Sequence, residues 1–160
     1  MHCVGLRYFN VFGRRQDPAG AYAAVIPRWF NALLKDESIE IFGDGDHSRD
    51  FCYVDNAIQA NLLAAMASNI STASVYNVAV GERTSLGELF IMMKQAINNL
   101  GVSYQQHPIY SPARNGDVLH SLANIEKAKI ELGYTPTHRL RDGLSEASSW
   151  YFNKLRSEKN

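Results

Sequence analysis

The sequence has few cysteines, no excess of either charge and no long hydrophobic run. Its 160 residues include 2 cysteines, and 16 basic residues balance 16 acidic ones. A nucleic-acid-binding protein normally carries a basic excess, so the balance argues against that class. The longest nearly apolar run, residues 62–67, is far shorter than the roughly 20 residues that span a bilayer. We therefore expect neither a nucleic-acid nor a membrane partner.

The cysteines and histidines show no pattern typical of a disulfide or a metal site. Cys3 and Cys52 both lie in apolar runs, so we expect two small core residues rather than a disulfide or a nucleophile. The five histidines, at positions 2, 47, 107, 120 and 138, lack the spacing of metal ligands. No secretory segment follows Met1. The expectation is a reduced, cytoplasmic protein without a metal.

Helical and strand-like patterns alternate along the chain. Apolar spacing predicts helices over residues 21–36 (beginning near 24 or 25, because Pro27 fits only a first turn), 55–67, 85–100, 125–132 and 140–155. Strands are expected at residues 3–7, 39–42, 51–54, 75–80 and 104–109. At least two of these strands are apolar enough to be covered on both faces. The predicted class is α/β, with helices on both faces of a parallel sheet.

Local signals predict several helix ends. Asp55 is expected to cap the second helix, which carries Ile58, Leu62, Leu63 and Met66. The alanines of this helix, at positions 57, 60, 64, 65 and 67, would allow close packing on a sheet. Ser85 and Glu88 form a capping-box pattern, and Gly133 is expected to end the short fourth helix.

Residues 6–17 combine a strand end with a polar turn. The apolar run ends at Phe9 and Asn10, and Gly13 then opens a turn. Ligands of open α/β sheets lie outside the carboxyl ends of the strands. The stretch therefore indicates a ligand site, although a buried strand with an ordinary glycine turn explains the same residues equally well.

Two arginines lie in turns that expose them. Arg49 follows a Gly-Asp-Gly turn, and Arg114 lies in the segment ARNGD. The planar guanidinium matches phosphate oxygens, and Asp117 could accept hydrogen bonds from ribose hydroxyls. Ordinary surface ion pairs, Arg49 with Asp50 or Arg114 with Asp117, are the alternative.

Three segments together resemble a known family. GLRYFNVFGRRQDP is similar to the RYFNxxG segment of extended short-chain dehydrogenases/reductases, in particular the UDP-hexose 4-epimerases. FGDGDHSRDFCYVDN resembles their GDGxxxRDFxxVxD segment, and ARNGDVLHSLANIEKAKIELGYTP resembles their RxGD…KA…LGYxP segment. The resemblance runs to about residue 152 and implies the C-terminal half of such a protein.

The resemblance implies a role for individual residues. Arg49 and Arg114 would clamp the phosphates of a UDP-sugar, Asn10 would bind pyrophosphate or sugar, and Asp117 the ribose. The backbone near Ala24 and Val25 would face phosphate, and that of Glu40 to Phe42 would hold uracil. Tyr8 and Phe9 would lie against the nicotinamide of NAD, and Gln16 is a possible sugar contact.

Ser121 bears on the choice of sugar. In the epimerases the fourth residue after the RxGD aspartate lines the pocket around the sugar's C2 substituent, and here that position is Ser121. A serine leaves room for an N-acetyl group that a tyrosine would fill. The segment GDVLHSLAN is also similar to the branch that uses UDP-N-acetylglucosamine or its uronic acid, which serves surface polysaccharides.

The family's reaction machinery is not found in this sequence. There is no Gly-rich dinucleotide turn after a strand, and no Tyr-x-x-x-Lys pair in a suitable context. The resemblance implies that residues 3–9 and 55–80 belong to a Rossmann-like NAD-binding sheet, of which they are a remnant. Residues 10–54 and 81–160 would mainly form the smaller α/β substrate domain. NAD would be bound mainly by an N-terminal half that this sequence lacks, so the chain itself is expected to be inactive.

The first functional hypothesis is the UDP-sugar-binding portion of an NAD-dependent UDP-N-acetylglucosamine/UDP-N-acetylgalactosamine 4-epimerase. A UDP-glucose or UDP-uronic acid 4-epimerase, or a sugar-nucleotide dehydratase, is the alternative within enzymes. A non-catalytic nucleotide-sugar-binding module is the alternative outside them. The full-length protein is expected to be a homodimer, and this chain is expected to self-associate through its unpaired strands.

Overall fold

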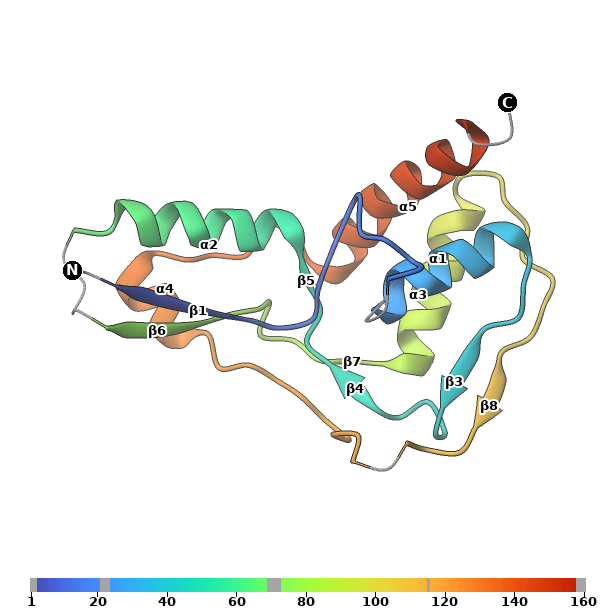
Figure 1. Cartoon of the computed structure of the whole chain (residues 1–160), viewed down its shortest axis with the longest axis horizontal. Helices are drawn as coiled ribbons and strands as arrows, with labels where there is room; N and C mark the ends of the chain where they lie inside the picture. Colours follow the sequence, from blue (N-terminus) through green and yellow to red (C-terminus); the bar gives the residue numbers. More distant parts are fainter. Residues whose placement is uncertain (1–2, 21–23, 69–72, 115, 158–160) are drawn as a thin grey trace.

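The computed structural model describes residues 3–20, 24–68, 73–114 and 116–157. Figure 1 shows two groups of elements side by side along the long axis of the molecule. Strands β1 (Val4–Tyr8) and β6 (Ser74–Val78) and helices α2 (Val54–Met66) and α4 (Glu126–Leu132) form one group. Helices α1 (Val25–Lys35), α3 (Leu86–Asn98) and α5 (Leu140–Ser157) form the other, with strands β3 (Glu40–Phe42) and β8 (Ile109–Ser111). The predicted α/β class is confirmed.

The first group is built on a parallel strand pair. β1 and β6 run parallel, with Leu6 opposite Tyr76, and α2 and α4 pack on them. Their shared core contains Tyr76, Val78 and Tyr134, and the Tyr134 hydroxyl donates a hydrogen bond of 2.8 Å to the carbonyl of Ala79. Small alanines of α2 face this core, which lets the helix approach the strands closely.

The second group has a core between three helices. Apolar stripes of α1, α3 and α5 meet there, and Phe30 stacks on Tyr151 with ring centroids 5.3 Å apart. β3 and β8 pair in parallel beside these helices. The amphipathic patterns read from the sequence for these three helices are confirmed, including the start of α1 next to Ala24, its N-cap residue. Residues 21–23 of that predicted helix lie outside the described residues.

Four very short strands join the two groups. β2 (Val11–Phe12) pairs in parallel with β5 (Cys52–Tyr53), and β4 (Ser48–Arg49) pairs antiparallel with β7 (Thr84–Ser85). Sequence patterns predicted only one of them, as a strand over residues 51–54. A strand of two residues is too short to show a periodicity, so β2, β4 and β7 were not predicted. The strand predicted over residues 104–109 is also displaced, because β8 begins only at Ile109.

The predicted start of α3 and the predicted end of α4 are confirmed, and each is determined by local capping residues. Ser85 and Glu88 form the capping box of α3, with the Ser85 hydroxyl accepting from the Glu88 amide at 3.2 Å. Gly133 ends α4 with a positive φ of 67°. The assignment of Asp55 as a cap was wrong. Helix α2 begins one residue earlier, after the N-cap residue Tyr53, and Asp55 in its first turn pairs with Arg14 instead.

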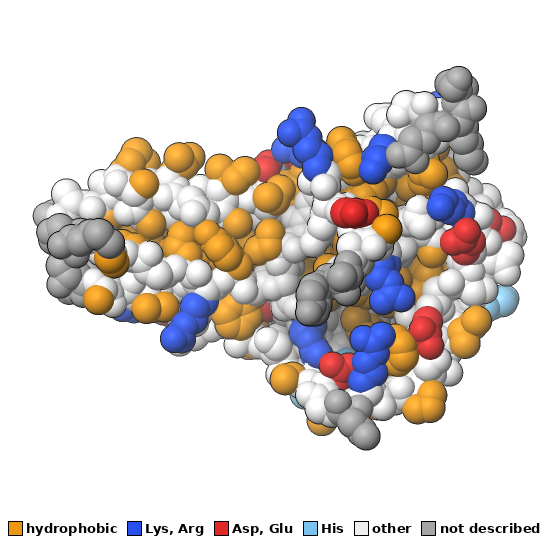
Figure 2. All heavy atoms as spheres, viewed as in Figure 1, with side chains coloured by type: hydrophobic (Ala, Val, Ile, Leu, Met, Phe, Trp, Pro, Cys, Tyr) orange, Lys and Arg blue, Asp and Glu red, His pale blue; other side chains and the backbone are white. Residues whose placement is uncertain are grey.

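The expected close packing of α2 through its alanines is confirmed, and its large apolar side chains are left mostly exposed. Its buried side chains are Asn56, Ala57 and Ala60, whereas Ile58, Leu62 and Met66 are 50%, 56% and 72% exposed. β1 is likewise not covered on both faces, and Cys3 beside it is exposed. Cys52, in contrast, is buried as expected. Figure 2 shows the resulting run of hydrophobic side chains over this part of the molecule.

The two cores do not test the division into a Rossmann-like part and a substrate part, which stays a prediction. Among the described residues, no helix has the length and apolar character needed to cross a membrane.

The exposed face of α2 leads to a first prediction, that the chain self-associates. In the described residues β1 pairs with β6 alone, and the α2 face beside it carries Leu62, which is 56% exposed. An unpaired strand edge beside exposed apolar side chains favours association. Light scattering over a dilution series should show a mass that falls on dilution, and Leu62→Lys should shift the chain toward monomer.

The control is Ile91→Lys, at a position on α3 that is 65% exposed in the other group. It should leave the dilution curve unchanged. A wild-type chain that stays monomeric at every concentration would contradict the prediction.

Candidate functional site

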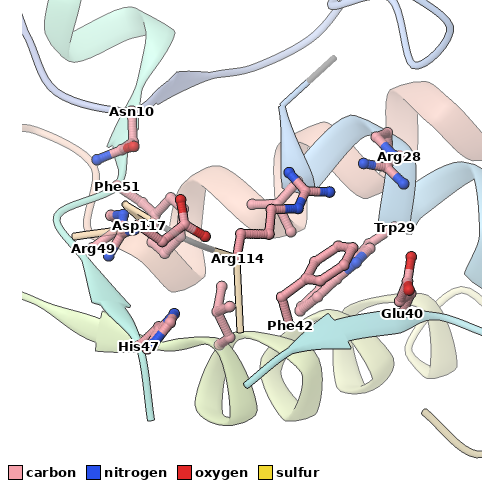
Figure 3. Close-up of a pocket in the computed structure, with 12 residues that line it drawn as sticks. Asn10, Arg28, Trp29, Glu40, Phe42, His47, Arg49, Phe51, Arg114 and Asp117 are labelled. Carbon is pink, nitrogen blue, oxygen red and sulfur yellow. The ribbon is translucent and has the colours of Figure 1, made fainter. Parts of the chain in front are cut away.

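A pocket of about 200 Å³ lies between α1, β3, β4 and the loop before residue 120. Figure 3 shows Arg114 near its middle, Arg49 and Asp117 toward one end, and Arg28 and Glu40 toward the other. The lining residues are Asn10, Val25, Arg28, Trp29, Glu40, Phe42, His47, Arg49, Phe51, Leu86, Arg114 and Asp117. Seven residues that the sequence predicted for the site are among them: Asn10, Val25, Glu40, Phe42, Arg49, Arg114 and Asp117.

Asn10 and Arg49 are held at the pocket by the backbone around them. Asn10 has a left-handed φ of 38°, and its side-chain amide donates to the carbonyl of Asp50 at 3.0 Å. Arg49 donates through Nη1 to the carbonyls of Ser48 and Leu119, at 2.9 and 3.3 Å. These bonds hold Nη1 beside the pocket and leave Nη2 and Nε without a hydrogen-bond partner among the described residues.

The Asp50 carboxylate faces away from Arg49, into the protein. It is fully buried and accepts hydrogen bonds from the amides of Val80 and Gly81 at 3.0 Å each, and from that of Ala123 at 3.4 Å. Burial raises the pKa of Asp50, and the three amide donors oppose that shift. The alternative of an Arg49–Asp50 surface ion pair is therefore wrong.

Arg114 rests on an aromatic ring rather than on a carboxylate. Its guanidinium carbon lies 3.8 Å from the centroid of Phe42, a cation–π contact. Asp117 touches the same segment only through its backbone amide, which donates to the carbonyl of Arg114 at 3.3 Å. Within the described residues Arg114 forms no ion pair, so the Arg114–Asp117 alternative is wrong as well.

The start of α1 gives the pocket an electropositive wall. The N-cap residue Ala24 has no side-chain hydrogen bond to the helix, and the first turn contains no acidic residue. The first amides of such a helix have no internal acceptor and lie at the positive end of its dipole. Val25 brings this end to the pocket.

On the opposite wall, β3 presents Glu40 and Phe42. Within the described part of the chain, β3 pairs with β8 alone, so its other edge is not paired with a strand. The Glu40 carboxylate accepts a hydrogen bond of 2.6 Å from the Ser111 hydroxyl on β8.

Five predicted site residues are not in the pocket lining. Tyr8 is half exposed and donates to Asn61 at 3.0 Å, and Phe9 packs partly against the α2–β6 core. The Gln16 side chain donates to the carbonyl of Val11. Ala24 is the N-cap residue of α1, and the Ser121 amide donates to the Ser48 carbonyl at 3.0 Å. Ser121 is thus tied to β4, next to Arg49.

Sequence reasoning missed five lining residues: Arg28, Trp29, His47, Phe51 and Leu86. Three of them are apolar and read in the sequence as ordinary core positions. His47 was dismissed because it lacks metal-ligand spacing. For Arg28 a signal existed, since a cation in the first turn of a helix opposes the helix dipole.

A cluster outside the pocket could in principle hold a metal ion. Asp55, His138 and Glu146 offer ligand atoms within 4.8 Å of one another. They are already paired, however, because Arg14 contacts Asp55 at 3.4 Å, and Glu146 accepts hydrogen bonds of 3.0 Å from Tyr53 and His138. We assign no metal to this cluster.

The pocket therefore offers three arginines, free helix-start amides, an aromatic face and a carboxylate, a set that suits a nucleoside diphosphate. Comparison with known proteins agrees with this chemistry. Residues 1–79 match the NAD dependent epimerase/dehydratase family.

Relatives extend the match over nearly the whole chain. A putative UDP-glucose 4-epimerase of Methanocaldococcus jannaschii is 38% identical over 152 residues, which are 95% of this chain and 46% of that protein. The crystal structure of UDP-glucose 4-epimerase from Thermotoga maritima with UDP-glucose aligns with a TM-score of 0.85 at 37% identity, covering 95% of this chain and 46% of that one.

A third comparison concerns a different sugar. UDP-N-acetylglucosamine 4-epimerase from Methanobrevibacter ruminantium, in complex with UDP-N-acetylmuramic acid, aligns with a TM-score of 0.82 at 38% identity, covering 94% of this chain and 46% of that one. The chain spans about half the length of the curated relatives it matches. The α/β arrangement with parallel strands matches these Rossmann-like epimerase structures.

The family is NAD dependent, and the described residues fit only one side of that cofactor. Tyr8 ends β1, at the carboxyl end of the β1–β6 pair, and half of its surface is exposed there. An exposed aromatic ring at this edge suits the face of a nicotinamide. The sequence contains no Gly-rich turn that would cradle the pyrophosphate of the dinucleotide.

The buried Asp50 gives a second prediction. An amide at this position would turn an NH₂ group toward at least one of the three backbone donors and leave that buried donor without an acceptor. Asp50→Asn should therefore lower the free energy of unfolding by about 1–3 kcal/mol. Urea denaturation measures the change, with the exposed Asp46→Asn as the matched control. Equal stability of the two variants would contradict the structural role of Asp50.

Proposed function

We propose that this chain is the UDP-sugar-binding portion of an NAD-dependent UDP-N-acetylhexosamine 4-epimerase. One observation carries the proposal: residues assigned to the ligand from three separate sequence segments line a single pocket. Asn10 comes from the first segment, Arg49 from the second, and Arg114 and Asp117 from the third. A chance similarity in three segments would not bring them to one cavity.

The contacts of the pocket support a definite orientation of the nucleotide. Arg49, Arg114 and the amide end of α1 at Val25 bind the pyrophosphate, whose oxygens accept charge-assisted hydrogen bonds. Asn10 adds an amide donor at the same end. The unpaired edge of β3, from Glu40 to Phe42, binds the uracil, and Asp117 accepts hydrogen bonds from the ribose.

The reaction proposed for the whole protein inverts the sugar at C4 through a 4-keto sugar. NAD, when bound, supplies the hydride acceptor for that carbon. The described residues hold the substrate rather than move its protons: the arginines fix the nucleotide so that the sugar extends from the pocket. Tyr8 and Phe9, at the end of β1, form part of the wall on the nicotinamide side. Gln16 is proposed as a further sugar contact.

The assignment of an N-acetylated sugar depends on the space that Ser121 leaves. Relatives at 37% and 38% identity act on UDP-glucose and on UDP-N-acetylglucosamine, so overall similarity does not choose between the sugars. A serine beside β4 leaves space that a tyrosine would fill, which favours the larger C2 substituent. This volume argument is the basis for the hexosamine assignment.

A third prediction tests the phosphate contacts. Charge-assisted hydrogen bonds contribute roughly 1.5–3 kcal/mol each. Arg49→Ala or Arg114→Ala should therefore weaken UDP binding about tenfold or more in calorimetry. Arg83→Ala removes an exposed arginine outside this pocket and should have no effect. Unchanged UDP affinity in both pocket variants would rule out the phosphate assignment.

A fourth prediction tests the sugar. Ser121→Tyr should weaken binding of UDP-N-acetylglucosamine and spare UDP-glucose, because the phenol overlaps the acetamido group. The control Ser121→Ala should change either affinity only slightly, since Ser121 acts through its small volume and not through a hydrogen bond. Competition calorimetry with the two sugar nucleotides measures the ratio of affinities. If Ser121→Tyr weakens both sugar nucleotides equally, or neither, the hexosamine assignment is wrong.

A further inference from the structure

We propose that Arg28 binds a phosphate of the ligand, as a third arginine of the pocket. The proposal rests on the proposed function, because it takes the ligand to be a uridine nucleotide. Arg28 lies in the first turn of α1, is exposed and lines the pocket. No sequence motif assigned it a role.

Arg28 lies in line with the other two arginines of the pocket. Figure 3 shows it at the end of the pocket that holds Glu40, with Arg114 between it and Arg49. The three arginines thus follow one another along the pocket, within reach of one anionic ligand.

The charges around Arg28 leave it available to an anion. In the described part of the chain it forms no ion pair. The acidic side chain at its end of the pocket, Glu40, already accepts a hydrogen bond of 2.6 Å from Ser111. An anion in the pocket would be the partner that Arg28 lacks.

The helix supplies a second, independent argument. A cation in the first turn of a helix opposes the helix dipole, and neither a capping side chain nor an acidic residue offsets it in α1. Arg28 is therefore unfavourable for the free helix and becomes favourable when an anion binds beside the same amides. A residue that costs stability without a ligand, and faces a pocket, is best explained by the ligand.

The test compares Arg28→Gln with Lys35→Gln, which removes an exposed cation at the other end of the same helix. Binding of uridine and UDP is measured by calorimetry or competition. Arg28→Gln should weaken UDP by a factor of about ten and leave uridine unchanged. Lys35→Gln should alter neither by more than about twofold. Without ligand, Arg28→Gln should melt at the wild-type temperature or above it.

Three results would overturn the assignment. Unchanged UDP affinity means that Arg28 is not a ligand contact, and loss of uridine binding means that it contacts the base. A lower melting temperature of the free variant means that Arg28 stabilises the fold. Failure of the Arg28 proposal can be told apart from failure of the proposed function. If Arg49→Gln and Arg114→Gln weaken UDP binding while Arg28→Gln does not, only the Arg28 proposal is wrong. If the wild-type chain binds no UDP, both fall.

Discussion

The fold depends on the hydrogen bonds between the buried Asp50 carboxylate and three backbone amides. Val80 and Gly81 follow strand β6, and Ala123 precedes helix α4, so one carboxylate joins the carboxyl end of the parallel strand pair to the chain that leads from the pocket. The backbone carbonyl of Asp50 also accepts a hydrogen bond from the side-chain amide of Asn10, which follows β1. The segment that joins β4 to β5 is therefore fastened to the group of β1, β6, α2 and α4 at the residue next to Arg49.

This arrangement also determines which charges the pocket can offer. Two acidic groups near the arginines are engaged elsewhere: Asp50 with backbone amides, and Glu40 with Ser111. Arg49 is steadied by carbonyl groups, and Arg114 by the ring of Phe42. Neither arginine is neutralised by a carboxylate in the described residues. The pocket keeps a net positive character in a chain whose formal charge is zero.

Sequence patterns predicted the parts of the molecule that one repeated interaction decides. Helices α1, α3 and α5 have a continuous apolar stripe, and the stripe alone determines their buried faces. Helix α2 was different, because large apolar side chains lie on one face and alanines on another. The alanines were expected to allow close packing on a sheet, and they form the buried face, which leaves Leu62 outside.

The candidate site was predicted to the extent that motifs named its residues. Arg49, Arg114 and Asp117 could be found because they lie in long matching segments. His47 could not, since what makes it part of the site is its place in the folded pocket. Arg28 was signalled as a cation in the first turn of a helix, but no motif named it. Two-residue strands such as β4 escaped prediction for the same reason as His47. Their pairing is decided by the partners that the fold brings to them.

The central claim is that the pocket binds a nucleoside diphosphate at the amide end of α1 and at the arginines. Titration of the isotopically labelled chain with UDP, followed by nuclear magnetic resonance, tests it most directly. We expect the Val25 amide and the side-chain nitrogens of Arg49 and Arg114 to shift together and to saturate at one concentration. Resonances of α4, such as that of Lys129, should stay in place. Shifts that spare these three residues, or an unchanged spectrum at saturating UDP, would contradict the account.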